Sequence, residues 1–372
     1  MIRGGREQSM LNRAADYFHD FHCLAGACPH TCCDGWEVVL DEETALRYFQ
    51  VPGALGEKLR SVIQADAEGD FCFPLRGGRC PFLNEENLCE IHLQLGEAAT
   101  SVTCRSHPRF IEDYGAFREI TLSAACPAAN ELLLGSREKL TFSSWEDEER
   151  SEPADPWLEG LTALRTRMLA ILTDRKAPLR RRLTDFLLLA WQAQALLDEE
   201  QGEALGDLVR TWGPQALECG AGPGLFPWAL RVLGELEVLE ADWRTLLRRG
   251  EETAPARGDE ALLERVACYF AFRHLLKAVN DGDLLGRAQL CVLAVLTVER
   301  LTPVCGGLGE ALRRFCRARR IWRRCWRPSG SGRSCPWCAF FGNCVFRENT
   351  IVHYDKVKRF AFMQNVKMHK IS

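Results

Sequence analysis

Residues 23–36 read CLAGACPHTCCDGW, and four cysteines fall within the first eleven of these residues. Gly26, Pro29 and Gly35 interrupt any regular helix or strand, so the stretch predicts a turn-rich loop. Such a loop lets several sulfur atoms converge, and soft thiolates suit zinc and iron–sulfur clusters. The stretch therefore predicts a cysteine-ligated metal centre.

More cysteines of the N-terminal region extend this pattern. Cys28, Cys80 and Cys126 are each followed by proline, as ligating cysteines often are in ferredoxin-type sequences. The paired Cys-x2-Cys hooks of zinc sites do not occur in this half of the sequence, which favours an iron–sulfur cluster and keeps zinc as the alternative. We expect the metal ligands to be a subset of Cys23, Cys28, Cys32, Cys33, Cys80, Cys89, Cys104 and Cys126.

The remaining cysteines receive other interpretations. Cys335, Cys338 and Cys344 form a CxxC-x5-C motif, which predicts a second metal site, with a zinc knuckle or a packed aromatic turn as the alternatives. His92 and His107 lie near cysteines but are left out of the ligand set, because such histidines often hydrogen-bond near a metal site instead. We expect packed thiols without metal, since free cysteine is often buried, at Cys72, Cys219, Cys268, Cys291, Cys305, Cys316 and Cys325.

Composition limits the class of protein. The chain has 372 residues, 47% of them hydrophobic and 26% charged, which is typical of a globular protein with two or three domains. A net charge of −4 makes nucleic acid an unlikely partner. No run reaches the roughly 20 apolar residues of a membrane span, and the N-terminus lacks the apolar core of a secretory signal. We therefore expect a cytoplasmic protein without membrane contact, in which eighteen cysteines indicate metal and not disulfides.

The sequence pattern predicts a mainly α fold in four parts. A loop-rich, cysteine-ligated domain is expected at 17–135, with a helix in DEETALRYF at 41–49. The acid- and proline-rich segment 136–156 is interpreted as a linker. Apolar residues at three- and four-residue spacing predict a helical domain at 157–327, and a cysteine motif with a tail follows at 328–372.

A basic stretch raises the question of a protein partner. Nine arginines and no acidic residue lie between Arg313 and Arg333, interleaved with Phe315, Trp322 and Trp326. We favour a solvated helix face, with docking of an acidic protein surface as the alternative.

Several motifs together are similar to a known family. They are CxxxxCxxxCCxGW at 23–36, CPFL at 80–83, TCRSHPR at 103–109 and the Cys126-Pro127 step. The chain resembles the eight-cysteine domain described as zinc- or iron-chelating, and within it the flagellin lysine-N-methylase family. The resemblance is strongest over residues 17–135 and extends more loosely through the helical middle to the motif at Cys335 to Cys344.

The resemblance implies a function. Members of the family transfer a methyl group from S-adenosylmethionine to surface lysines of flagellin, using an iron–sulfur cluster, in the cytoplasm. The sequence has no strand followed by a GxGxG-type loop and no CxxxCxxC motif, so we expect a cluster iron with an open position to hold S-adenosylmethionine. The alternative is a non-catalytic zinc- or iron-binding module. Tyr114, Glu112, Asp113 and Tyr354 are conceivable proton acceptors, and nothing in the sequence selects a catalytic residue among them.

Overall fold

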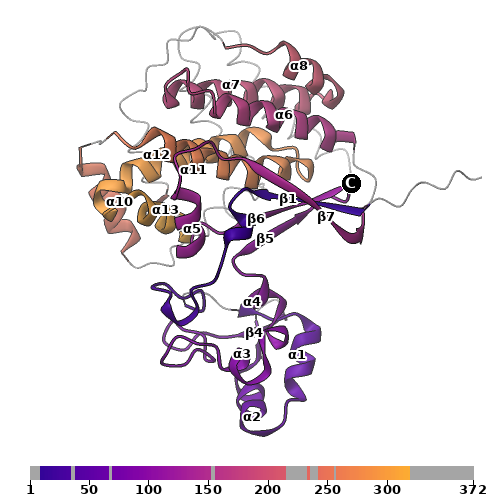
Figure 1. The fold of residues 1–372 in the computed structure, drawn as a ribbon, viewed down its shortest axis with the longest axis vertical. Helices are drawn as coiled ribbons and strands as arrows, with labels where there is room; N and C mark the ends of the chain where they lie inside the picture. The colour runs from indigo at the N-terminus through magenta and orange to yellow at the C-terminus, as the bar shows by residue number, and fades with distance from the viewer. Residues whose placement is uncertain are drawn as a thin grey trace, which may run out of the picture.

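The structure, a computed structural model, describes residues 9–34, 38–66, 69–151, 156–214, 233–234, 242–254 and 257–318. Figure 1 shows two parts. A small lobe that carries helices α1 to α4 lies below a β-sheet, and the longer helices lie above and beside that sheet. The predicted segment 328–372, with Cys335, Cys338 and Cys344, lies outside the described residues.

A four-stranded sheet in the order β5-β6-β1-β7 connects the two parts. Strand β1 pairs in parallel with β6, in a register that places Leu11 opposite Phe117, and it pairs antiparallel with β7. Because β1 and β6 are parallel, the chain leaves both strands at the same edge of the sheet. The strands are β1 (Ser9–Ala15), β5 (Arg109–Asp113), β6 (Phe117–Leu122) and β7 (Phe142–Arg150).

The lobe is the segment of chain between β1 and β5, and it has a hydrophobic core of its own around Tyr48, Leu59, Phe73 and Phe82. A second sheet, in the order β2-β4-β3, lies within it. The helix predicted at 41–49 is confirmed as α1. The lobe contains η1 (Phe18–Asp20), η2 (Ala25–Ala27), β2 (Val38–Val39), α1 (Glu42–Phe49), α2 (Gly53–Val62), β3 (Gln64–Ala65), β4 (Phe71–Phe73), α3 (Glu90–Leu95), η3 (Glu97–Ala99) and α4 (Val102–Ser106).

Helices form most of the larger part, so the expectation of a mainly α fold holds at this level. Apolar stripes of α6, α7, α11 and α12 bury Leu164, Phe186, Phe270 and Val298 in the larger core. The helices are α5 (Pro127–Leu134), α6 (Pro156–Leu172), α7 (Leu179–Asp198), η4 (Gly202–Ala204), α8 (Leu205–Thr211), α10 (Trp243–Glu252), α11 (Glu260–His274), η5 (Leu275–Val279), α12 (Leu284–Cys305) and α13 (Leu308–Arg317).

Helix α12 is the single helix among the described residues that is long and apolar enough to cross a membrane, with 22 residues and a mean hydropathy of 1.5. It packs against α7, α10, α11 and α13. Its buried side chains include Arg287 and Gln289, which are polar. The length and apolar character of α12 are therefore those of a core helix in this bundle.

The predicted linker 136–156 contains a strand instead. Residues 142–150 form β7, which pairs along β1 from Ala15 to Ser9. The sequence of this strand is acidic and lacks the alternating apolar face from which a strand is predicted. Backbone hydrogen bonds to β1 stabilise it instead, together with stacking of Trp145 on Phe18, whose ring centroids are 5.5 Å apart. Residues 109–134, expected in the cysteine domain, supply β5, β6 and α5 beside the larger core.

A buried ion pair joins the sheet to the bundle. Arg165 on α6 donates to Glu119 on β6 at 2.5 Å and to the Phe272 carbonyl at 3.1 Å. Both side chains of the ion pair are at most 6% exposed. Each charge is therefore compensated mainly by its partner, because little water reaches the pair.

Replacing one partner is expected to be costly. Glu119→Leu should lower the free energy of unfolding by about 3–5 kcal/mol, because Arg165 would remain buried and uncompensated, whereas Glu119→Leu with Arg165→Met should recover most of the loss. Urea unfolding measures both variants. Asp207→Asn, which breaks the exposed Asp207–Arg210 pair, is the control and should change stability by less than about 1 kcal/mol. Equal losses for the control and Glu119→Leu would contradict this account.

Asp41 ties two helices of the lobe together. Its carboxylate accepts hydrogen bonds from the Thr44 amide at the start of α1 and from the Val102 amide at the start of α4, each at 2.9 Å. Burial alone would raise the pKa of Asp41, but the hydrogen bonds from Val102 and Thr44 outweigh burial and lower the pKa to about 2.

Asp41→Ala should therefore destabilise the lobe by about 1 kcal/mol at pH 7. Because the pKa of Asp41 is lower in the folded chain than its ordinary 3.8, this stabilisation is present above about pH 4 and is lost as the pH falls toward 2. Thermal unfolding at pH 7, 4 and 2 should show the wild type and the variant converging at the lowest pH. The exposed Glu57→Gln variant is the control, and a gap that persists at pH 2 would refute the assigned role.

Candidate functional site

Four of the predicted ligands lie together inside the lobe. The Cys80 amide donates to the Cys33 carbonyl at 2.8 Å, and Cys89 forms a β-bridge with Leu83, three residues beyond Cys80. Cys104 lies on α4. Cys80 belongs to the core of the lobe, and the other three cysteines pack against it.

The thiols of this lobe group act on one another electrostatically. Burial, and then the neighbouring Cys104 and Cys89, raise the pKa of Cys80 to about 11 against the opposing effect of the Phe82 amide. Burial also raises the pKa of Cys104, and Cys89 adds to the effect. Thiolates so placed repel one another unless a cation lies between them.

Cys33 also contacts its neighbour in the sequence. The hydrogen bond between the two thiols lowers the pKa of Cys32 to about 7 and raises that of Cys33, as do burial and the nearby Cys80 and Cys104. Cys32 is therefore the sulfur of this pair that carries negative charge most readily.

Cys23, Cys28 and Cys126 form a second group, at the junction of the lobe and the sheet. Cys126 follows β6 and is the N-cap residue of α5, and it packs against the larger core. Burial raises the pKa of Cys126, the Ala129 and Ala128 amides at the start of α5 oppose this, and Cys28 and Cys23 raise it further. We call these three residues the junction group.

The junction thiols lie on short turns. The Ala25 amide donates to the Cys23 sulfur at 3.3 Å. Burial raises the pKa of Cys28, and the adjacent Cys23 and Cys32 add to the rise. Cys32 thus acts electrostatically on Cys28 of the junction group as well as on Cys104 of the lobe group.

The chemistry of these donors fits a thiophilic metal or an iron–sulfur cluster. All eight predicted ligands are described, and none of the described cysteines is in a disulfide. Within the described ranges, no three cysteine, histidine, aspartate or glutamate side chains are arranged to hold a metal ion as they stand. Which of the eight bind metal stays a prediction.

An open cavity of about 650 Å³ adjoins the junction group, and the sequence analysis did not find it. Asp20 and His22 line it just before Cys23, and Ala128 lines it just after Cys126. Its lining also comes from the end of α5 and from α11. Acidic residues close to Cys23 in the sequence could have indicated a negatively charged site. The other wall of the cavity could not be predicted, because the parallel pairing of β1 with β6 brings α5 next to these residues.

The cavity wall carries a negative charge excess, from Asp16, Asp20, Glu131 and Glu138 against Arg265. The Arg265 side chain is itself buried and donates to the carbonyls of Leu133 at 2.6 Å and Glu138 at 3.0 Å. Asp16 accepts a hydrogen bond from the Thr141 hydroxyl at 2.8 Å. Among the described residues, the carboxylates of Asp20 and Glu131 have no hydrogen-bond or ion-pair partner, so both can receive a cation.

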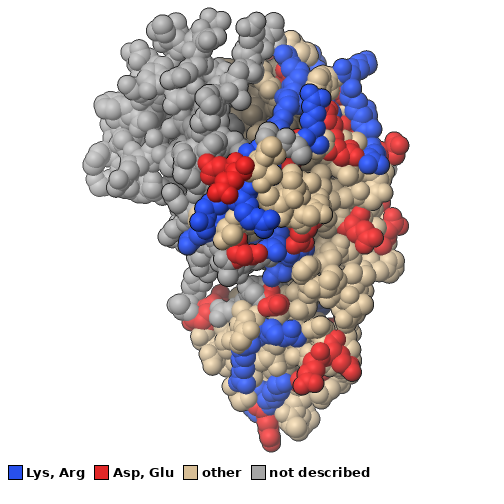
Figure 2. All heavy atoms as spheres, turned by 90° about the vertical axis from the view of Figure 1, so that its left-hand side faces the viewer, with Lys and Arg blue, Asp and Glu red and all other residues tan. Residues whose placement is uncertain are grey.

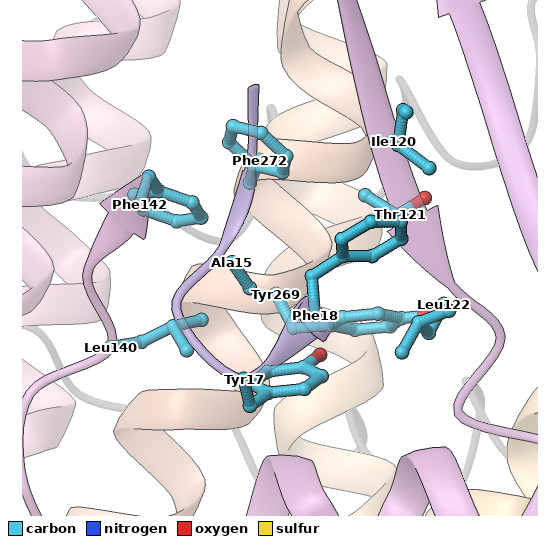
Figure 3. A pocket seen from close by; sticks show the side chains of 10 residues that line it. All are labelled: Ala15, Tyr17, Phe18, Ile120, Thr121, Leu122, Leu140, Phe142, Tyr269 and Phe272. Carbon is cyan, nitrogen blue, oxygen red and sulfur yellow. The ribbon is translucent and has the colours of Figure 1, made fainter. Parts of the chain in front are cut away.

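A second void shares Tyr17 with this cavity and is too small for a ligand. Figure 3 shows the rings of Phe18, Phe142 and Phe272 and the side chain of Tyr17 around it. Its volume of about 10 Å³ holds no more than one water molecule. Tyr17 lines both spaces, so aromatic packing supports the cavity from behind.

Of the four conceivable proton acceptors, Glu112, Asp113 and Tyr114 do not line the cavity. Glu112 pairs with Lys277, and Asp113 pairs with Arg118 at 2.7 Å. Tyr114 is half-buried next to Phe117, and burial raises its pKa. Tyr354 lies outside the described residues.

The described part of the arginine-rich stretch is bound within the molecule. Arg313 is buried and pairs with Glu310, and Arg314 pairs with Glu310 and with Asp242. Residues 319–333 lie outside the described ranges. Figure 2 shows basic and acidic side chains interspersed over the described surface of one face.

The chain is similar to three known proteins. It is 31% identical over 131 residues to the flagellar biosynthetic protein FliU of Salmonella muenchen, and this alignment covers 33% of this chain and 76% of that protein. It is 30% identical over 132 residues to the lysine-N-methylases of Salmonella typhimurium and Salmonella choleraesuis, which covers 33% of this chain and 32% of each. The match thus spans most of FliU but about a third of the two methylases. No family model and no solved structure matches the chain.

Proposed function

Because this chain belongs to the flagellin lysine-N-methylase family, we propose that it transfers a methyl group from S-adenosylmethionine to lysine side chains on the surface of flagellin. The reaction takes place in the cytoplasm, on flagellin that has not yet been exported. A non-catalytic metal-binding module is the alternative function.

The acidic cavity beside the junction cysteines is the observation that carries this proposal. A lysine side chain arrives as an ammonium ion, and the carboxylates of Asp20 and Glu131, which pair with no other described residue, can receive it. The cavity is open, so a lysine on the surface of a folded protein can enter it. The negative wall also attracts a basic patch around the target lysine.

The chemistry of methyl transfer sets a second demand. The lysine nitrogen must lose a proton, because its pKa is near ~10.4 and only the neutral amine has the electron pair that attacks the methyl carbon. The N–CH₃ bond then forms while the S–CH₃ bond breaks, and the sulfonium becomes a neutral thioether. The cavity walls hold the amine in place for this attack, and its open side lets the released proton reach water.

The cysteines supply the metal part of the proposal. Their thiolates would hold an iron–sulfur cluster, with zinc as the alternative, and such a cluster would supply an iron position for the amino and carboxylate groups of S-adenosylmethionine. His22 and Ala128 line the cavity, and Cys23 and Cys126 lie one and two residues from them in the sequence. Donor and acceptor would therefore meet at one edge of the sheet.

Removing the two cavity carboxylates tests the lysine site. Asp20→Asn with Glu131→Gln should raise the KM for flagellin by at least about tenfold with little change in kcat, because each hydrogen bond to a charged group contributes about 1.5–3 kcal/mol. The assay measures methyl-lysine on flagellin by mass spectrometry over a range of flagellin concentrations. The difference should shrink at high salt, since exposed charges are screened.

The matched control is Glu199→Gln with Glu200→Gln, which removes two exposed carboxylates at the end of α7, away from the cavity lining. Its KM should equal that of the wild type. An unchanged KM in the cavity variant would exclude the cavity as the lysine site. No methyl-lysine with the wild type would favour the metal-binding module.

A further inference from the structure

Five arginine side chains are buried among the described residues, and four of them have a carboxylate partner. The four ion pairs are Arg165 with Glu119, Arg182 with Glu264, Arg287 with Asp281 and Arg313 with Glu310. A buried charge that lacks a partner of opposite sign is costly to the folded chain. The fifth arginine, Arg265, is 3% exposed, and no described carboxylate forms an ion pair with it.

The end of α5 holds the Arg265 guanidinium in a fixed orientation. Its Nε donates to the Leu133 carbonyl at 2.6 Å, and its Nη1 donates to the Glu138 carbonyl at 3.0 Å. Leu133 is in the last turn of α5, where the carbonyls lack partners within the helix. Nη2 has no hydrogen-bond partner among the described residues. The two carbonyls therefore orient the guanidinium and leave the N–H groups of Nη2 for another acceptor.

Arg265 contributes to the wall of the 650 Å³ cavity. It is the single arginine or lysine among the described residues of the lining, whose other charged side chains include Asp16, Asp20, Glu131 and Glu138. An acceptor for Nη2 that also compensates the guanidinium must carry negative charge, yet the carboxylates of the wall repel a simple anion. A ligand that has a carboxylate close to an ammonium group satisfies both conditions.

We propose that Arg265 is a carboxylate-binding residue of the cavity: the carboxylate of the ligand lies against Nη2, and its ammonium group lies against the carboxylates of the wall. Arginine suits this role, because its planar guanidinium is always charged and matches the geometry of a carboxylate. The inference rests on the proposed function for the identity of the ligands.

Both reactants of the proposed reaction can supply this carboxylate. S-adenosylmethionine has a carboxylate next to its amino group. A lysine on a helix of flagellin has one nearby when an acidic residue lies about four positions away, on the same helix face. The chemistry at Arg265 is the same in both cases, so the ligand whose affinity depends on Arg265 identifies the source.

Arg265→Gln tests the site in the full-length protein. Isothermal titration calorimetry measures the dissociation constants for flagellin and for S-adenosylhomocysteine, the thioether that the reaction leaves. The affinity for one of the two should fall at least about tenfold, because hydrogen bonds from a charged donor are lost. Arg265→Lys keeps the positive charge and should recover part of the affinity. Circular dichroism verifies that both variants fold.

Arg300→Gln is the matched control. Arg300 donates to two carbonyls at the end of α10, that of Gly250 at 2.6 Å and that of Glu251 at 2.9 Å, and it does not line the cavity. The control variant loses the same kind of contact with a helix end, so both dissociation constants should equal those of the wild type. An Arg265 with a purely structural role would give the same result as Arg300.

Changes in the ligand test the same position in the wild-type protein, where no variant has to fold. The methyl ester of S-adenosylhomocysteine keeps the amino group and lacks the negative charge. Flagellin peptides that carry a methylated lysine are compared with glutamate or glutamine about four positions away. The wild type should bind either the ester or the glutamine peptide at least about tenfold more weakly than its charged counterpart.

The two arms identify the source of the carboxylate. A loss confined to S-adenosylhomocysteine assigns it to the methyl donor, at Arg265 and not at a cluster iron, whereas a loss confined to flagellin assigns it to an acidic side chain beside the target lysine. Equal affinities for charged and uncharged ligands, with an unchanged Arg265→Gln variant, would overturn the inference. Binding that depends on Arg265 without methyl-lysine on flagellin would refute the proposed function and support this inference. A wild type that binds neither ligand would overturn both.

Discussion

The parallel pairing of β1 with β6 is the constraint on which the rest of the structure depends. It joins residues more than 100 positions apart, Leu11 with Phe117, and it makes both strands end at one edge of the sheet. Eight residues beyond β1 the chain reaches Cys23, and four residues beyond β6 it reaches Cys126. The junction group and the acidic cavity therefore exist only if this pair forms, and the lobe between β1 and β5 is held at both of its ends.

Two hydrophobic cores lie on either side of this sheet, and each supports different cysteines. The larger core of the bundle fixes β6 through the buried pair of Glu119 and Arg165, and the side chain of Asn130 on α5 donates to the Ala124 carbonyl at 2.9 Å. Cys126 is thus held on a rigid support. The smaller core supports the lobe group, whose metal would stabilise a domain of modest size.

The sequence predicted those elements whose formation depends on residues close together in the chain. The turn-rich cysteine loop, the helix at 41–49 and the helical character of 157–317 within the described ranges follow from spacing and capping. Strand β7 carries acidic residues where an apolar face would be expected, so only its pairing with β1 identifies it. The cavity combines residues around Asp20 with residues around Glu131, and no spacing rule relates segments that meet through a parallel pair. The division of the cysteines between two groups was inaccessible for the same reason.

The most direct test of the account compares methyl transfer by metal-loaded and metal-free protein. Full-length protein purified without oxygen, and the same protein after chelation, are incubated with flagellin and S-adenosylmethionine that carries a labelled methyl group. Circular dichroism verifies that the metal-free chain keeps its helices. The account predicts labelled methyl-lysine on flagellin with the loaded protein and none with the folded, metal-free protein. Equal labelling by both would contradict a role for the cysteine centre in the reaction.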